Sequence, residues 1–75
     1  YLTNDYLKAE KYLRRAVELM PYDPIVNDHY GDILWRLDKK IQARYFWKNV
    51  LKIKDVEKEM IKKINDKLLE GPGKS

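Results

Sequence analysis

The chain has 75 residues, of which 37% are charged, and its formal net charge is +4. A chain of this length has room for one small domain that buries only roughly 60% of its unfolded surface, which argues against a deep catalytic cleft. The absence of cysteine excludes a disulfide framework, a thiolate nucleophile and a cysteine-based zinc site, and no apolar run approaches the roughly 20 residues that span a bilayer.

The first predicted helix covers residues 4–20, where apolar side chains recur at the spacing of one helix face. Pro21 ends this helix because proline interrupts helical hydrogen bonding. Asp23 followed by Pro24 has the chemistry of an N-cap and a first turn. A second helix is therefore expected over residues 24–37.

The second half of the chain is also predicted to be helical. Asp38 tolerates the left-handed backbone conformation that a tight turn between helices often needs, so a third helix is expected over residues 40–53. Asp55 is placed to cap a fourth helix over residues 56–70, which Gly71 then ends. The short connections predict that each helix packs antiparallel to the next one.

An internal repeat with a period of 34 residues is the strongest signal in the sequence. A shift of this size places the apolar and small residues of the first helix on those of the third: Leu7 on Ile41, Ala9 on Ala43, Tyr12 on Phe46, Leu13 on Trp47, Val17 on Leu51 and Leu19 on Ile53. The second and fourth helices align through Val26 on Met60, Tyr30 on Ile64 and Leu34 on Leu68. A fixed period of two helices is typical of a helical solenoid.

The period and several residues resemble the tetratricopeptide repeat, whose signature runs W-x2-L-G-x2-Y, then A-x3-F, then P. The residues that carry the resemblance are Tyr30, Gly31 and Leu34 in the first element, Ala43 with Trp47 and Ala9 with Leu13 in the second, and Pro21 as the closing proline. Asn27 and Asp55 stand where the family has its tryptophan and second proline. The stretch 28–37 is also similar to a bacterial subtype of these repeats.

The resemblance implies an all-α fold of antiparallel helical hairpins stacked as a short α-solenoid, with about one and a half repeats and a capping helix over residues 1–70. Residues 71–75 are expected to form a flexible tail. The implied function is a non-catalytic scaffold that binds a protein or peptide without a cofactor or metal. A chain with a single histidine also offers no arrangement for nucleophilic or acid–base catalysis.

The resemblance further implies a concave binding groove, lined by the first helix of each repeat. The expected groove residues are Ile25, Asp28, Asp32, Trp35 and Arg36, joined by Lys62 from the closing helix. An exposed Trp35 beside two carboxylates would suit a peptide with an apolar anchor flanked by Lys or Arg. The alternative is that the carboxylates are only solvated and Trp35 packs on a neighbour.

A second candidate surface is a basic ridge on the third helix, where Lys40, Arg44, Lys48 and Lys52 recur every four residues. Such a ridge could contact the phosphates of RNA or an anionic membrane surface. No exposed aromatic residue is expected within it for base stacking. The alternative is a solvated lysine-rich face that only favours solubility.

Two further hypotheses concern the first helix and the residues near His29. The first helix lacks the partner that would precede it in a longer array, so Tyr6, Leu7 and Leu13 are expected to be partly uncovered. Homo-oligomerisation through this helix, or a purely structural role as the end-piece of a longer array, are then alternatives. Asp28, His29 and Asp32 share one helical turn, but a lone histidine rarely forms a metal site.

Overall fold

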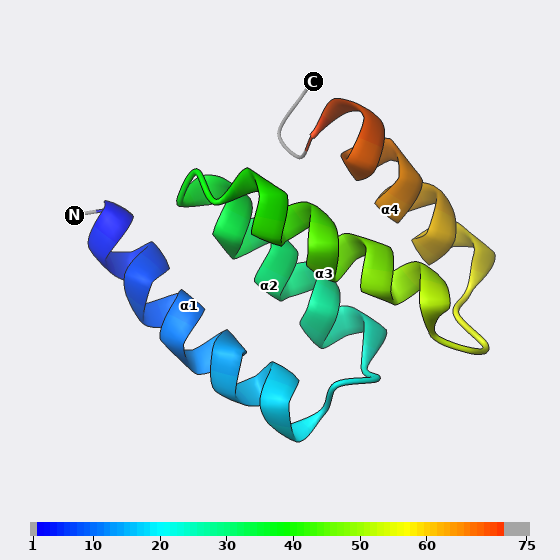
Figure 1. The fold of residues 1–75 in the computed structure, drawn as a ribbon, viewed down its shortest axis with the longest axis horizontal. Helices are drawn as coiled ribbons and strands as arrows, with labels where there is room; N and C mark the ends of the chain where they lie inside the picture. The colour runs from blue at the N-terminus through cyan, green and yellow to red at the C-terminus, as the bar shows by residue number, and fades with distance from the viewer. Residues whose placement is uncertain (1, 72–75) are drawn as a thin grey trace.

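Four α-helices make up the described part of the chain (Figure 1). The structure is a computed structural model that describes residues 2–71, with side chains described from residue 5 onward. The helices are α1 (Leu2–Leu19), α2 (Pro24–Arg36), α3 (Lys40–Lys52) and α4 (Lys58–Glu70), and residues 2–71 contain no strand. The all-α class is confirmed, and each helix end lies within two residues of the position expected from the sequence.

The turns before α2 and α3 follow the local chemistry of the sequence. The Asp23 side chain caps α2, since its Oδ1 accepts hydrogen bonds from the backbone N–H groups of Ile25 at 2.9 Å and Val26 at 3.0 Å. Asp38 adopts the expected left-handed conformation with a φ of 63°. The first boundary is therefore fixed by a side-chain cap, and the second by a left-handed backbone conformation, without a side-chain capping bond at the start of α3.

The turn before α4 differs from the expectation. Asp55 does not cap α4, because the helix begins at Lys58, and Glu57 occupies the N-cap position without a side-chain capping bond. Asp55 instead takes a φ of 62°, so its backbone makes a left-handed bend after α3. Gly71 ends α4 as expected, with a φ of 84°. The rest of the predicted tail, residues 72–75, lies outside the described residues.

Asn27, which stands where the tetratricopeptide signature has tryptophan, has a structural role. Its buried side chain donates two hydrogen bonds from Nδ2, one to the Pro21 carbonyl oxygen at 3.0 Å and one to the Asp23 carbonyl oxygen at 2.9 Å. The first bond gives the Pro21 carbonyl in the turn between α1 and α2 a partner, and the second adds to the backbone bond that the Asp23 carbonyl accepts from the Asn27 N–H at 3.1 Å. The Asn27 side chain thus holds that turn against the start of α2.

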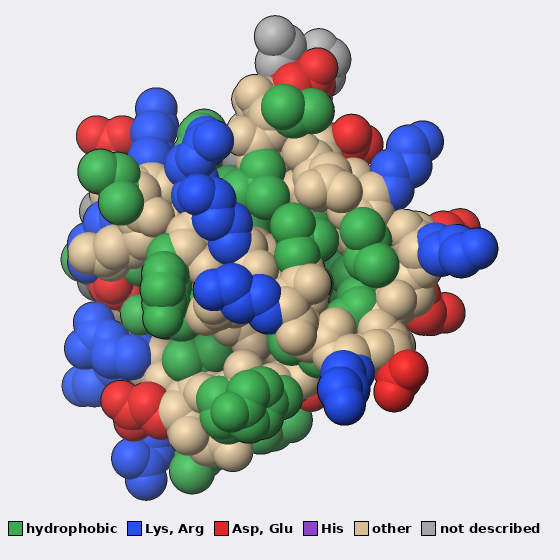
Figure 2. Space-filling model, turned by 45° about the vertical axis from the view of Figure 1, so that its right-hand side comes forward, with side chains coloured by type: hydrophobic (Ala, Val, Ile, Leu, Met, Phe, Trp, Pro, Cys, Tyr) green, Lys and Arg blue, Asp and Glu red, His purple; other side chains and the backbone are tan. Residues whose placement is uncertain are grey.

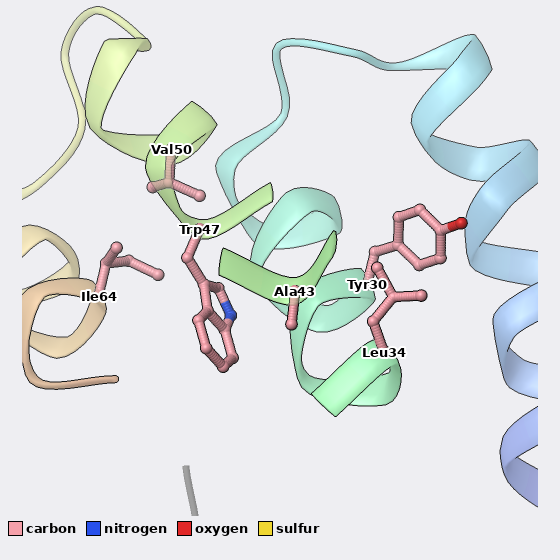
Figure 3. Packing of buried hydrophobic residues seen from close by; sticks show 6 residues of the cluster. All are labelled: Tyr30, Leu34, Ala43, Trp47, Val50 and Ile64. Atoms are coloured by element: carbon pink, nitrogen blue, oxygen red, sulfur yellow. The ribbon is translucent and has the colours of Figure 1, made fainter. Parts of the chain in front are cut away.

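Each helix packs mainly on the next one along the chain, and successive helices run in opposite directions (Figure 1). The fully buried apolar residues come from α2, α3 and α4: Tyr30, Leu34, Ala43, Trp47, Val50 and Ile64. Trp47 lies between Ile64 of α4 and the residues of α2 (Figure 3). Trp47 is fully buried, with none of its surface exposed.

α1 is joined to the other helices through the buried carboxylate of Glu10. This carboxylate accepts a hydrogen bond from Lys39 Nζ at 2.7 Å and lies 3.6 Å from the Arg14 guanidinium. The Tyr30 hydroxyl points toward α1 (Figure 3) and raises the pKa of Arg14 above its ordinary value, and Glu10 adds to this effect. The pairing of Glu10 with Lys39 fixes α1 against the turn between α2 and α3.

The apolar residues of α1 that were expected to be partly exposed differ in their exposure. Tyr6 and Leu13 are half-buried, whereas Leu7 is exposed. Basic residues separate the exposed apolar side chains of α1, so no continuous apolar stripe faces outward from the described part of this helix. Homo-oligomerisation through α1 stays a prediction.

Gly31 permits the close approach of α2 and α3. A Cβ atom added at this position would lie 2.4 Å from Trp47 Nε1 and 2.6 Å from Trp47 Cδ1. Because the indole is fully buried and held on every side, it has no room to retreat. The lack of space between α2 and α3 therefore explains why a residue without a side chain stands at position 31.

Replacing Gly31 with alanine is expected to lower the free energy of unfolding by about 1–3 kcal/mol, since the added methyl group overpacks the contact. Trp47→Phe removes the indole nitrogen that lies closest to the new atom. The double variant should therefore lose less stability than the sum of the two single variants, measured by urea denaturation. Strictly additive losses would show that the indole does not limit the space at Gly31.

Candidate functional site

The two carboxylates of the predicted groove face α4 and are bound to one of its lysines. Lys67 Nζ donates to Asp28 Oδ1 at 2.7 Å and to Asp32 Oδ1 and Oδ2 at 2.9 and 3.1 Å. Lys63 Nζ lies a further 3.3 Å from Asp28 Oδ2. Asp28 is buried, with only 1% of its side chain exposed, so this carboxylate does not lie on an open surface.

The ion-paired cluster of Asp28, Asp32, Lys63 and Lys67 holds α4 against α2. A basic peptide at this place would have to displace Lys67, whose side chain is only 12% exposed, and leave its charge without a partner. Breaking a buried pair in this way is costly. The charges that suggest a site for Lys or Arg side chains are thus already neutralised within the chain.

Trp35 packs on its neighbours in the same region. Its ring centroid lies 5.6 Å from that of Trp47, and the ammonium group of Lys40 lies 5.0 Å above its ring. The edge of the Trp35 ring contacts Gly71, where an added Cβ would come within 2.6 Å of Cζ2. The structure therefore matches the packing alternative for this tryptophan, which is half-buried.

Three predicted groove residues have exposed side chains. Ile25 and Arg36 lie on α2, and Lys62 lies on α4. His29 is also exposed, next to the buried Asp28. Together these residues present a surface of mixed apolar and basic character, from which the acidic groups of the predicted groove are largely withdrawn.

The basic ridge on α3 has a different environment. Residues 39–54 hold six of the sixteen Lys and Arg residues and none of the twelve Asp and Glu residues, so this segment carries +6 while the rest of the chain sums to −2. Lys40 lies 3.9 Å from Asp38. Within the described residues, Arg44, Lys48 and Lys52 are exposed and take part in no ion pair.

Apolar side chains are interleaved with these cations. Ile41 is 86% exposed and Tyr45 is 59% exposed, and both share a helix face with Lys48 and Lys52. The expectation that the ridge has no exposed aromatic residue is wrong. The Tyr45 ring meets the Phe46 ring edge-on, with centroids 5.0 Å apart and an interplanar angle of 88°, so Phe46 takes the inner position. Ile41, Arg44, Tyr45, Lys48 and Lys52 are called the α3 face below.

Two of the shallow hollows in this region lie beside α3 and past its C-terminal end at Lys52. The first has a volume of about 300 Å³ and is lined by Ile41, Arg44, Tyr45 and Lys48. The second has a volume of about 490 Å³ and is lined by Tyr22, Lys52, Ile53 and Lys54. In Figure 2, Lys and Arg side chains alternate with hydrophobic side chains over one face of the molecule. Open hollows of this kind fit side chains of a macromolecular partner better than an enclosed small molecule.

Other kinds of site are limited by what the described residues contain. Between residues 2 and 71, no group of three or more His, Asp or Glu side chains is arranged to hold a metal ion. Across the same range, no helix is long and apolar enough to cross a membrane. No known family model, curated protein or solved structure shows significant similarity to this chain.

Proposed function

We propose that the chain is a non-catalytic module that binds another protein or peptide, and that the contact lies on the α3 face. The observation that carries this proposal is the combination of unpaired cations and exposed apolar side chains on one helix. Interfaces are built from apolar anchors surrounded by polar groups that exclude water. Exposed residues such as Ile41 and Tyr45 do little for the fold, so a partner gives them a role.

The tetratricopeptide resemblance supports the same class of function. Consecutive helices pack antiparallel, and Gly31 and Ala43 lie at close helix contacts, as the repeat requires. In an array of that type α3 would be the second helix of its repeat and would lie on the convex side. The proposed contact is therefore on the opposite side from the concave groove that the resemblance implies.

Ion pairs and aromatic packing within the chain argue against the predicted groove as the main contact surface for a partner. Asp28 and Asp32 are bound to Lys67, and Trp35 is packed against Trp47 and Gly71. Among the predicted groove residues, Ile25, Arg36 and Lys62 are exposed, Asp32 and Trp35 are only partly exposed, and Asp28 is buried. The α3 face, by contrast, keeps its cations free for a partner.

A second candidate function is the binding of single-stranded RNA, which is favoured by the exposed Tyr45 ring among unpaired cations. The strongly exposed Ile41 distinguishes the two functions, because an aliphatic side chain buries apolar area against a protein but does not stack well on a base. Protein binding is therefore the better-supported function. RNA binding would also weaken steeply with salt, with a slope that counts the phosphates contacted.

Two charge-reversal variants test the proposal, and each changes the formal charge of the chain by the same amount. Lys48→Glu alters the α3 face, and Lys62→Glu alters the exposed side of α4. With a fluorescein-labelled peptide of glutamate and leucine as the probe, Lys48→Glu is expected to weaken binding by about tenfold and Lys62→Glu by less than about twofold. Fluorescence anisotropy measures both affinities. Equal losses of affinity, or a larger loss for Lys62→Glu, would show that the peptide does not bind on α3.

A further inference from the structure

The hollow beside Ile41 and Tyr45 has a preformed apolar wall. The Tyr45 ring meets the Phe46 ring edge-on, and the centroid of the Phe46 ring lies 4.6 Å from that of the buried Tyr30. These contacts limit the movement of the Tyr45 ring, so a partner does not have to order it. Ile41 lies four residues before Tyr45 on the same helix face and is 86% exposed. The hollow, of about 300 Å³, therefore offers one place for an apolar side chain.

The cations on the N-terminal side of this hollow are already paired within the chain. Lys39 Nζ is bound to the Glu10 carboxylate at 2.7 Å. Lys40 Nζ lies 3.9 Å from Asp38 Oδ1 and 5.0 Å above the Trp35 ring. The positive charge at the start of α3 is therefore largely compensated before a partner arrives.

The cations on the C-terminal side of the hollow have no such contacts. Lys48 and Lys52 lie three and seven residues after Tyr45, or about 4.5 and 10.5 Å farther along the helix axis, and they share its face. Both lysines are exposed, and among the described side chains neither takes part in an ion pair. The same holds for Arg44, which lines the hollow itself. The uncompensated positive charge thus begins at the hollow and continues on one side of it.

We infer that the partner places one apolar side chain in this hollow and has carboxylates on only one side of that anchor, where they meet Lys48 and Lys52. This inference rests on the protein-binding function proposed above and specifies the partner of that site. The anchor buries apolar area against Ile41 and Tyr45, and the carboxylates beside the free cations fix its orientation. Carboxylates on the other side of the anchor would meet Asp38 and lysines that already have partners.

Two fluorescein-labelled peptides of identical composition test this arrangement, each with one leucine and the same number of glutamates. In the one-sided peptide all the glutamates follow the leucine, and in the centred peptide half of them precede it. The one-sided peptide is expected to bind about threefold more tightly in fluorescence anisotropy at low salt, because all its carboxylates can reach free cations. Equal affinities would overturn the one-sided arrangement.

Neutral variants compare the two ends of α3. Lys48→Gln and Lys52→Gln should each weaken binding of the one-sided peptide about threefold, whereas Lys40→Gln should change it by less than about 1.5-fold. Ile41→Ser should weaken it about tenfold, and the matched control Ile25→Ser, on α2, should leave it unchanged. All five side chains are exposed, so each variant is expected to keep the fold. A loss for Lys40→Gln as large as that for Lys48→Gln would overturn the inference.

Failure of this inference and failure of the proposed function give different results. A third peptide, with lysines in place of the glutamates, might be expected to be repelled by the +6 segment 39–54 and should not bind. If it bound as tightly as the one-sided peptide and lost affinity in Ile41→Ser, protein binding on α3 would stand and the acidic partner would be wrong. If no peptide bound while a single-stranded RNA bound with steep salt dependence, both would fail.

Discussion

Replacing Trp47 with alanine is expected to lower the free energy of unfolding by about 3–5 kcal/mol. The side chain is fully buried, and its Nε1 donates a hydrogen bond to the Asp28 carbonyl oxygen at 3.3 Å. Its ring also packs on Trp35 and lies 5.9 Å from Lys67 Nζ. The substitution therefore removes apolar burial, a hydrogen bond and the support of the α2–α4 ion pairs together.

Urea denaturation followed by far-UV circular dichroism measures this loss. A chain of 75 residues has a total stability of roughly 4–11 kcal/mol, so the alanine variant will approach or cross the unfolding threshold. Trp47→Phe keeps the measurement within range because it removes less volume. Leu69→Ala is the matched control, since Leu69 is 83% exposed and its loss should change stability by less than about 0.5 kcal/mol. A similar small loss for Trp47→Ala would contradict the assigned core.

Lys67→Met is expected to cost about 3–5 kcal/mol of stability. The substitution leaves the buried Asp28 carboxylate with only the longer 3.3 Å contact to Lys63, whose side chain is 55% exposed. It also removes both contacts to Asp32. The cost arises because a charge taken out of water loses most of its compensation.

A double variant isolates the pair from the rest of the cluster. Lys67→Met combined with Asp28→Asn removes both charges, so it should be less destabilised than Lys67→Met alone. Lys62→Met is the control on the same helix, because Lys62 is exposed and should contribute less than about 0.5 kcal/mol. Equal losses of stability for Lys67→Met and Lys62→Met in chemical denaturation would show that the ion pairs of Lys67 do not stabilise the fold.

The helices could be predicted from the sequence because their signals are local. Proline at position 24, the Asp23 cap and the turn-forming Asp38 each act within a few residues, and the structure contains them as expected. Asp55 shows the limit of this reasoning. An aspartate before an apolar run suits both an N-cap and a left-handed bend, and the choice depends on how far α3 must turn to meet α4.

The pairing of Asp28 and Asp32 could not be predicted from α2 alone, because their partner lies far away in the sequence. The bond from Lys67 to Asp28 joins residues 39 positions apart, so the isolated helix resembles a solvated acidic face. One signal was available in the sequence. Asp28 and Asp32 are four residues apart on α2, as Lys63 and Lys67 are on α4, and such pairs can meet when the helices pack side by side.

The exposure of Tyr45 is not determined by its immediate neighbours in the sequence. Tyr45, Phe46 and Trp47 are consecutive aromatic residues, and periodicity within two or three residues does not determine which of them turns outward. Packing around Ala43 and Val50 directs Trp47 and Phe46 inward and leaves Tyr45 on the α3 face. The wider spacing does indicate this position, because Tyr45 lies four residues after Ile41 and three residues before Lys48 on one helix face.

Binding of a protein partner on the α3 face can be measured by mapping amide chemical shifts of the chain during titration with the acidic peptide of glutamate and leucine. We expect the largest changes at Ile41, Tyr45 and Lys48. The amides of Ile25 and Arg36 should stay nearly unchanged. Changes centred on Ile25 and Arg36, with Tyr45 unaffected, would contradict this expectation and return the contact to the α2 side.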